Sequence, residues 1–362
     1  MGRIEVEELF YRGELYYDVS LELPGKISGS YRSAISPGLS DAHAHPQVID
    51  VGEGGIWKNS YEWISKRKLR VREGDLRKDA RLSSEFAEAT LKLSILDGIT
   101  MMAMTGSLHG NLDAVRRMKA RPRTVILPTV MNREGWLSAG ELRNVISRGV
   151  FMDGGKMMGG IFIHSLNFTD PISLKEALSL VKSEGIPLSM HLNEGIEEAE
   201  RLRKLVGDDV RGIAAVHCIE ETEKCRELGL KIISCPISNL YLYGKTIESL
   251  SFVDAFGSDW PLVTGTMKKV LSKASEIYGI SAELLRKATV GGYEVFGMRH
   301  EGDFAFYDEP LSSVASGKSE PKLVLIGWEE MVIEGKVEGE GKGEVEKKLK
   351  ETIEDALAIY GM

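Results

Sequence analysis

The sequence has only seven histidines, and two of them are separated by a single residue. His43 and His45 follow the apolar segment Ile35–Leu39. Side chains two residues apart in a strand project to the same side, so both imidazoles can reach one point. Converging neutral imidazoles suit Zn²⁺ or another borderline divalent ion. A hydrogen-bonded pair of histidines without a metal is the alternative that this motif leaves open.

Three more side chains capable of metal or acid–base chemistry stand at the ends of apolar runs. His191 closes one run, His217 closes the next, and Asp259 follows a third. A carboxylate beside histidines could serve as a metal ligand, as a base, or as both. If these runs are strands with a common direction, their ends gather four histidines and one aspartate.

The middle of the chain alternates eight short apolar runs with amphipathic charged stretches. Strands that alternate with helices form parallel units, because parallel neighbours need a crossover connection. Eight such units are the number that closes a (β/α)8 TIM-type barrel, whose active sites lie at the C-terminal ends of the strands. The predicted strands are 34–45, 98–105, 124–130, 160–164, 186–191, 213–218, 230–235 and 252–259. The helical patterns between them include 83–96, 138–147, 173–183, 197–205 and 221–228.

Both ends of the chain are predicted to be rich in strands. Apolar residues recur at every second position from Leu15 to Leu23, and strand patterns return after residue 300. We therefore expect an α/β protein in which 1–36 and 300–338 form a small β-sandwich and 37–299 form the barrel. The remaining segment, 339–362, has the apolar spacing of an amphipathic helix that packs on the same chain.

Composition and charge exclude several classes of protein. The chain has 43% hydrophobic residues, too many for a disordered protein, and its net charge of −8 disfavours nucleic acid and anionic membranes as partners. No apolar run approaches the roughly 18 residues of a membrane span, and the N-terminus lacks a secretory signal pattern. Cys218, Cys225 and Cys235 cannot all pair with one another, which fits a reducing cytoplasm. We expect a cytoplasmic protein with a small-molecule substrate, and a homo-oligomer stays open.

The segment Pro37–His45, PGLSDAHAH, resembles the first-strand signature of the amidohydrolase superfamily. The resemblance continues in order with the run ends at His191 and His217 and with Asp259. It extends to Glu301–Asp308, EGDFAFYD, which is similar to the return of the chain from the barrel to the small sheet in these enzymes. The resemblance implies a metal-bearing barrel with a terminal β-sandwich, in agreement with the pattern of elements.

Two further motifs resemble those of the mononuclear deaminase branch, which includes cytosine, guanine, adenosine and triazine deaminases. His191–Glu194, HLNE, looks like its His-x-x-Glu motif, and Cys235–Asn239, CPISN, is similar to its Cys-Pro-x-Ser-Asn motif. The binuclear branch usually has a modified lysine at the end of the fourth strand, whereas the run Gly160–His164 ends without one. The resemblance therefore favours a single divalent ion, Zn²⁺ or alternatively Fe²⁺.

Carried over residue by residue, the resemblance implies a role for each of these residues at the predicted strand ends. The metal ligands would be His43, His45, His191 and Asp259. Glu194 would be the proton shuttle, and His217 would orient and polarise the attacking water. A carboxylic acid at that place can protonate the ring nitrogen beside the attacked carbon and then the departing amine, because ammonia leaves far better than amide ion. This chemistry suits an enzyme that hydrolyses C–N bonds other than peptide bonds and deaminates a small heterocycle of the amidine type.

Candidates for substrate contacts lie near the same predicted rim. They are Trp57, His109, His164, Ser238 and Asn239. Trp57 could stack on a planar heterocycle or pack the first loop. His109 and His164 could face the pocket or pack at the rim, and Ser238 and Asn239 could bind substrate or cap a strand end.

Two other functions stay open. Gly257–Pro261, GSDWP, also resembles a branch with lactonases and nonoxidative decarboxylases, so the first alternative is a hydrolase of cyclic amides, imides or lactones on the same scaffold. The second is a non-catalytic barrel that only binds a ligand. Such a protein would have an incomplete site, and no position is missing from the set above.

Overall fold

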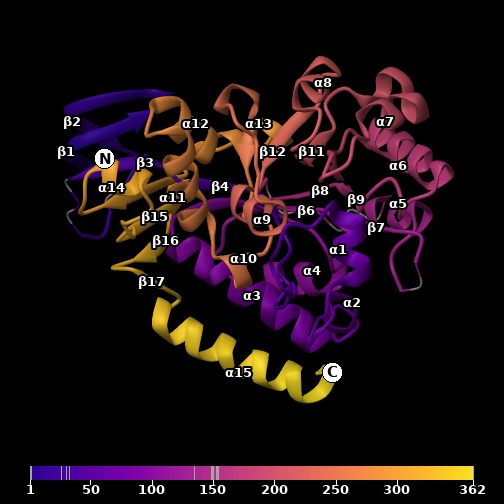
Figure 1. The fold of residues 1–362 in the computed structure, drawn as a ribbon. Coiled ribbons are helices and arrows are strands. Elements are labelled where there is room, and N and C mark those ends of the chain that lie inside the picture. Colours follow the sequence, from indigo (N-terminus) through magenta and orange to yellow (C-terminus); the bar gives the residue numbers. More distant parts are fainter. Residues whose placement is uncertain are drawn as a thin grey trace.

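The computed structural model of the 362-residue chain describes residues 2–25, 27–29, 31, 33–133, 135–147, 151 and 155–361. The described strands form two parallel sheets in the middle of the chain and one sheet from both chain ends (Figure 1). This arrangement confirms the predicted α/β class. Parts of the predicted domains lie outside the described residues, at positions 1, 26, 30, 32, 134, 148–150, 152–154 and 362.

All strand pairs within the two middle sheets are parallel, as the alternation of strands and helices predicts. The four-stranded sheet has the order β4 (Leu39–Ala44), β5 (Ile99–Met104), β6 (Arg123–Ile126) and β8 (Met157–Gly159). The six-stranded sheet has the order β13 (Ala255–Phe256), β12 (Lys231–Ser234), β11 (Ala214–His217), β10 (Leu188–Leu192), β9 (Ile161–Ile163) and β7 (Thr129–Val130). Each of the eight predicted runs overlaps at least one of these strands.

Some strand bounds differ from the predicted runs. The run 34–45 contains β3 (Ala34–Pro37) and β4, which pair in different sheets. Gly38 separates them at a point of close packing, where a Cβ atom would lie 2.2 Å from Cγ2 of Thr100. The run 124–130 divides into β6 and β7, and β8 lies outside the predicted runs.

The first and last parallel strands meet at their C-terminal ends. Ala44 and Asp259 form a parallel bridge there. The backbone N–H of His45 donates to the carbonyl of Asp259 at 2.7 Å, and the N–H of Asp259 donates to the carbonyl of His43 at 2.9 Å. Two segments far apart in sequence therefore lie side by side where β4 and β13 end.

Helices occupy most connections between the parallel strands and cover the sheets (Figure 1). Their bounds are α1 (Ser60–Lys66), α2 (Glu73–Leu76), α3 (Ala80–Leu96), α4 (Leu108–Arg117), α5 (Ala139–Ser147), α6 (Pro171–Glu184), α7 (Ala199–Val206), α8 (Thr222–Glu227), α9 (Pro236–Tyr243), α10 (Pro261–Thr264), α11 (Met267–Tyr278), α12 (Ala282–Thr289), α13 (Gly291–Phe296), α14 (Leu311–Ala315) and α15 (Lys342–Tyr360). Helix α6 shows why such segments form. Asp170 caps its first turn, Pro171 fits that turn without needing an N–H partner, and Gly185 ends it with φ of 64°. The predicted helices correspond to α3 and α5–α8.

The two chain ends form one continuous eight-stranded sheet. Its order is β18 (Glu340–Gly341), β17 (Lys336–Val337), β16 (Glu329–Ile333), β15 (Leu323–Ile326), β14 (Phe304–Tyr307), β3, β1 (Gly2–Tyr11) and β2 (Glu14–Leu23). Antiparallel pairing of β3 with β14 joins the two ends, with Ala34 opposite Tyr307. The two-layered sandwich and the domain boundaries stay predictions.

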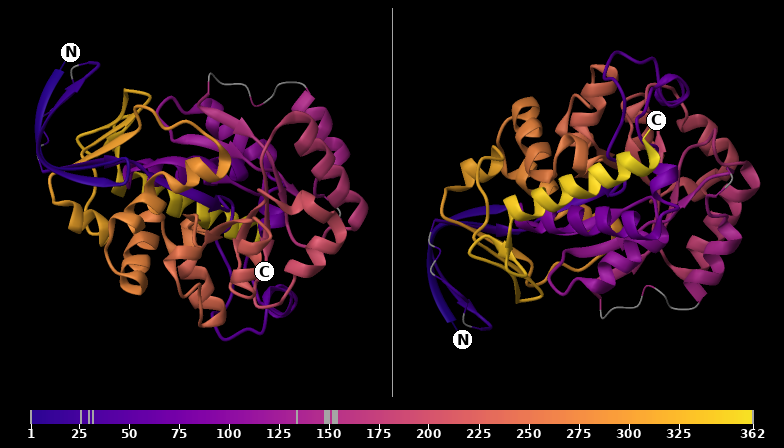
Figure 2. Two further views of the ribbon diagram at one scale, coloured as in Figure 1. Left: turned by 90° about the horizontal axis from the view of Figure 1, so that it is seen from above. Right: turned by 90° about the horizontal axis from the view of Figure 1, so that it is seen from below.

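The C-terminal helix α15 lies along α3, as Figure 1 shows and the view from below in Figure 2 confirms. Its apolar side chains Leu349, Ile353 and Leu357 pack in one cluster with Leu82 and Phe86 of α3. The amphipathic face therefore packs on the same chain. Within the described part of the chain, every helix is too short or too polar to cross a lipid bilayer.

Candidate metal centre and active site

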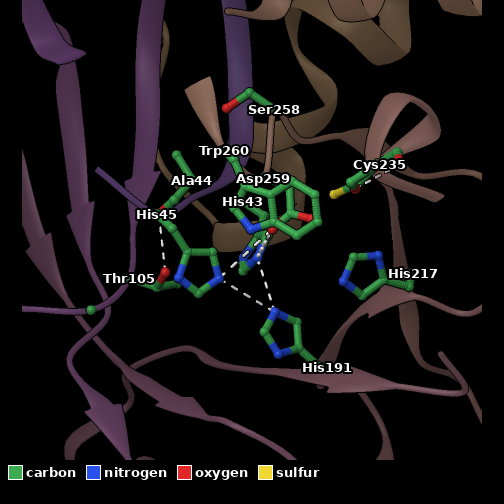
Figure 3. A network of polar contacts seen from close by, with 12 residues as sticks. His43, Ala44, His45, Thr105, His191, His217, Cys235, Ser258, Asp259 and Trp260 are labelled. Carbon is green, nitrogen blue, oxygen red and sulfur yellow. Dashed lines mark hydrogen bonds and ion pairs between the residues drawn. The ribbon is translucent and has the colours of Figure 1, made fainter. Parts of the chain in front are cut away.

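Four side chains meet at the C-terminal ends of the parallel strands (Figure 3). They are His43, His45, His191 and Asp259, and their ligand atoms all lie within 4.8 Å of one another. Nε2 of His191 is 3.2 Å from Nε2 of His43 and 3.5 Å from Nε2 of His45. Oδ1 of Asp259 is 3.4 Å from Nε2 of His43. The structure thus brings together the four residues that the sequence suggested as ligands.

The backbone at the end of β13 turns the Asp259 carboxylate into this cluster. Asp259 has φ of 63°, a left-handed conformation that costs a non-glycine residue about 1–2 kcal/mol. Its two backbone hydrogen bonds with β4 hold it there. Buried Asp41 adds a brace, because its carboxylate accepts from the N–H of Ser258 at 2.9 Å and from the hydroxyl of Ser258. The turn that carries Asp259 is therefore fixed from both sides.

The electrostatic state of the cluster suits a cation. Burial lowers the pKa of His43 to about 4 and the pKa of His191 well below its ordinary value, so both imidazoles are neutral at pH 7. Burial raises the pKa of Asp259, but the hydrogen bond with His43 and the nearby histidines outweigh this effect and keep the pKa below its usual range. Neutral imidazoles with an ionised carboxylate are the donor set of a divalent metal site.

Two buried atoms of the cluster, Nδ1 of His43 and Oδ2 of Asp259, have no hydrogen-bond partner, although buried polar atoms are nearly always paired. An ion bound by the four side chains would supply the missing interaction for the Asp259 carboxylate. The residues present therefore fit a divalent metal ion.

Groups behind the histidines set which ring nitrogen faces the cluster. Nδ1 of His191 lies 3.0 Å from the carbonyl oxygen of His164, so it donates and leaves Nε2 free. Nδ1 of His45 lies 3.5 Å from Oε1 of Glu73. Burial lowers the pKa of His45, but the hydrogen bond and charge of Glu73 outweigh it, and the net pKa is raised.

Glu194 and His217 form a second buried pair beside the cluster. Oε1 of Glu194 is 3.7 Å from Nε2 of His217, and the hydroxyl of Tyr243 donates to the same oxygen at 2.7 Å. Burial raises the pKa of Glu194 above its ordinary value, although His217 and Tyr243 act in the opposite direction. A carboxyl group with a raised pKa can both hold and release a proton near neutral pH.

His217 is held in one orientation by the motif that follows β12. Its Nδ1 lies 2.8 Å from Oδ1 of Asn239, so the ring donates there and presents Nε2 toward Glu194. The His191 and His217 rings are 5.1 Å apart between centroids. Asn239 and Tyr243 are four residues apart on α9 and so share one helix face, which serves both members of the pair.

The candidate substrate contacts occupy different surroundings. The half-buried side chain of His164 lines a cavity of about 600 Å³, and burial lowers its pKa to about 3. Ser238 is buried and donates to the carbonyl of Cys235 at 3.1 Å. Trp57 packs beside a cluster that contains Tyr243, whereas His109 is exposed on α4.

Glu73 and Tyr243 are site residues that the sequence analysis missed. Glu73 lies in a charged stretch with no strand or motif beside it. Tyr243 could have been found from its four-residue spacing to Asn239 on a predicted helix.

Comparison with known proteins gives one curated relative and several similar structures. The 5-methylthioadenosine/S-adenosylhomocysteine deaminase of Natronomonas pharaonis is 25% identical over 174 residues, which span 40% of this chain and 40% of that protein. A zinc-bound adenosine deaminase from Xanthomonas campestris has a TM-score of 0.76 at 15% identity, covering 98% of each chain. The zinc complex of atrazine chlorohydrolase from Arthrobacter aurescens has a TM-score of 0.76 at 13% identity, covering 97% of this chain and 99% of that one.

These structural likenesses establish a shared fold. The sequence model of the amidohydrolase family matches residues 34–303, which include every member of the metal cluster as well as Glu194 and His217. The resemblance inferred from the sequence motifs is confirmed. The chain belongs to the amidohydrolase family.

Proposed function

We propose that this protein is a metal-dependent enzyme that hydrolytically deaminates a small nitrogen heterocycle. The observation that carries the proposal is the buried Glu194–His217 pair beside the four-ligand cluster, with Tyr243 bonded to Glu194. Hydrolysis of a C–N bond needs an activated water and a group that delivers a proton to the leaving nitrogen, and Glu194 is placed to be that group. The names of the relatives, two of which are deaminases, agree with this reaction.

In this proposal one divalent ion, Zn²⁺ or alternatively Fe²⁺, is held by His43, His45, His191 and Asp259. When bound, such an ion lowers the pKa of water toward about 7 and so supplies a nucleophile at neutral pH. Asp259 accepts a proton from the attacking water, because its carboxylate lies in the cluster and is ionised, its pKa being below the usual range. His217 orients that water through Nε2, since Asn239 holds its other nitrogen.

Glu194 carries the protons in the remaining steps. Its raised pKa favours the protonated form, which donates to the ring nitrogen next to the attacked carbon. The ionised Glu194 then takes the hydroxyl proton of the tetrahedral carbon and passes it to the amino group, so that the C–N bond breaks and ammonia leaves as the carbonyl forms. The proton that Asp259 took from water returns to Glu194. Tyr243 fixes the orientation of this carboxyl group through one short hydrogen bond.

We extend the proposal to the fold and the location of the protein. The Ala44–Asp259 bridge joins β4, an edge strand of the four-stranded sheet, to β13, an edge strand of the six-stranded sheet. On the other side, the chain passes directly from β8 of the first sheet into β9 of the second, with one residue between them. Both observations support one closed (β/α)8 barrel. Cys218, Cys225 and Cys235 are buried free thiols, which supports a reducing cytoplasm.

The test combines metal analysis with a screen for ammonia release from aminopurines, aminopyrimidines, pterins and triazines. We expect about one divalent ion per chain, and loss of ammonia release in Glu194→Gln with the metal content unchanged. Glu197→Gln is the matched control, because Glu197 is exposed three residues further along. Normal turnover of Glu194→Gln would contradict the proton role. Ring opening without ammonia would instead favour the cyclic amide or lactone hydrolase, and absence of turnover with all substrates would favour a binding protein.

A further inference from the structure

A strongly basic cavity adjoins the metal cluster. Its volume is about 600 Å³, and its described lining has two carboxylates, Glu73 and Asp75. The basic lining residues are Arg67, Lys68, Arg72, Arg77, Lys78 and Arg133. Within the described part of the chain, none of these six forms an ion pair, whereas Lys66 and Arg70 in the same segment pair with Glu62 and Asp50. The chain as a whole is acidic, so this concentration of unpaired positive charge is local.

Three of the arginines are fixed by aromatic side chains. The guanidinium carbon of Arg67 is 4.0 Å from the ring centroid of Trp63, that of Arg77 is 3.8 Å from Trp136, and that of Arg133 is 4.1 Å from Phe168. Stacking orients a planar guanidinium while leaving most of its N–H groups free to bind an anion.

Arg77 has an N–H group that is buried and free to bind a ligand. Its Nε is buried and has no hydrogen-bond partner, and a second nitrogen donates to the backbone carbonyl of Gly135. Burial also lowers the pKa of Arg77 and of Arg67, as expected for cations without a nearby counter-charge strong enough to compensate. A buried N–H group that is left unpaired costs free energy, and an anionic ligand would remove that cost.

The cavity borders the metal cluster through two of its lining residues. His164 lines the cavity, and its carbonyl oxygen accepts the hydrogen bond from His191. Glu73 lines it as well and lies against His45. A substrate whose reacting ring lies at the cluster would therefore extend past His164 and Glu73 toward the arginines.

We propose that this basic cavity binds a phosphate monoester group of the substrate, so that the heterocycle is deaminated as part of a phosphorylated compound such as a nucleoside monophosphate. The inference rests on the proposed function. The cavity lining has six positive side chains and two negative ones. This excess of positive charge favours a dianionic group over a neutral nucleoside or over the zwitterionic end of an amino acid. Guanidinium groups bind phosphate oxygens through two parallel hydrogen bonds, which makes the stacked arginines the specific contacts.

The first experiment measures binding without turnover. Inorganic phosphate is titrated into the metal-loaded full-length protein by calorimetry, for the wild type and for Arg77→Gln and Arg133→Gln. We expect each substitution to weaken phosphate binding about 10- to 100-fold, as for loss of a charge-assisted contact. Arg77→Lys should recover part of the affinity, which separates a charge effect from misfolding. Arg70→Gln is the control, since Arg70 is exposed in the same segment and pairs with Asp50 at 3.6 Å instead.

The second experiment compares kcat/KM for ammonia release from nucleosides, from their 5′-monophosphates and from S-adenosylhomocysteine. A preference of at least tenfold for the monophosphate, lost in Arg133→Gln, supports the proposal. Equal use of the nucleoside, preference for the zwitterion, or phosphate binding that no arginine substitution changes would overturn it. If phosphate binding depends on the arginines while no compound releases ammonia, the basic site stands and the deaminase function fails.

Discussion

Replacement of Tyr243 by Phe isolates one hydrogen bond at the proton-transfer residue. The hydroxyl of Tyr243 donates to Oε1 of Glu194 at 2.7 Å, and both side chains are at most 5% exposed. A donor stabilises the ionised carboxylate, so its removal raises the pKa of Glu194 further. Phe retains the ring and leaves its packing with Trp63 and Leu242 in place. The variant therefore changes one contact and little else.

The size of the effect follows from the type of bond. A buried hydrogen bond to a charged group contributes about 1.5–3 kcal/mol, and 1.36 kcal/mol corresponds to about one pH unit. Because the proposed step needs protonated Glu194, the alkaline limb of the activity profile reports its titration. We expect that limb to move to higher pH by about one to two units in Tyr243→Phe. We also expect kcat to fall, since the carboxyl group loses its fixed orientation.

The assay is kcat/KM for ammonia release as a function of pH, with metal content and thermal stability measured in parallel. Tyr241→Phe is the matched control, because Tyr241 lies on the same helix, is 40% exposed and bonds to the carbonyl of Gly52 instead. The control should keep the wild-type profile. An alkaline limb in Tyr243→Phe that stays in place, or moves to lower pH, would refute this account of Glu194.

Two further predictions concern stability and metal binding. Asp303→Asn should destabilise the fold by about 3–5 kcal/mol in urea denaturation, because the bidentate partner Arg123 loses its buried counter-charge. Glu294→Gln, which breaks an exposed bidentate pair, should cost at most about 1 kcal/mol, and equal losses in the two variants would contradict the role of burial. Asp259→Asn should lower the bound metal per chain in elemental analysis and abolish ammonia release. Full metal occupancy in this variant would exclude Asp259 as a ligand.

The ends of the strands were the part of the site that the sequence could predict. Alternation along a strand places His43 and His45 on one side, and an apolar run that stops at a histidine identifies a strand end. Both signals are local in sequence. The structure accordingly brings together His43, His45, His191 and Asp259, which come from three separate strand ends.

Other features depend on packing between segments that carry no shared pattern. The run 34–45 looks like one strand because apolarity continues through Gly38, where the structure has a break and close packing against Thr100. Glu73 reaches His45 from a loop rich in charge, where one acidic residue looks like any other. The basic cavity is lined by the segment that contains α1 and α2 and by the loops after β7 and β9, so no single sequence segment reveals it.

The bridge between Ala44 and Asp259 has a consequence for assembly of the holoenzyme. The cluster takes two ligands from the first parallel strand and its last ligand from the final one. During synthesis, the histidines emerge long before the carboxylate, so a nascent or truncated chain offers an incomplete and weaker coordination set. Tight binding of a cation would thus indicate that all the parallel strands have formed. Loss of the ion would weaken the contact between the ends of β4 and β13.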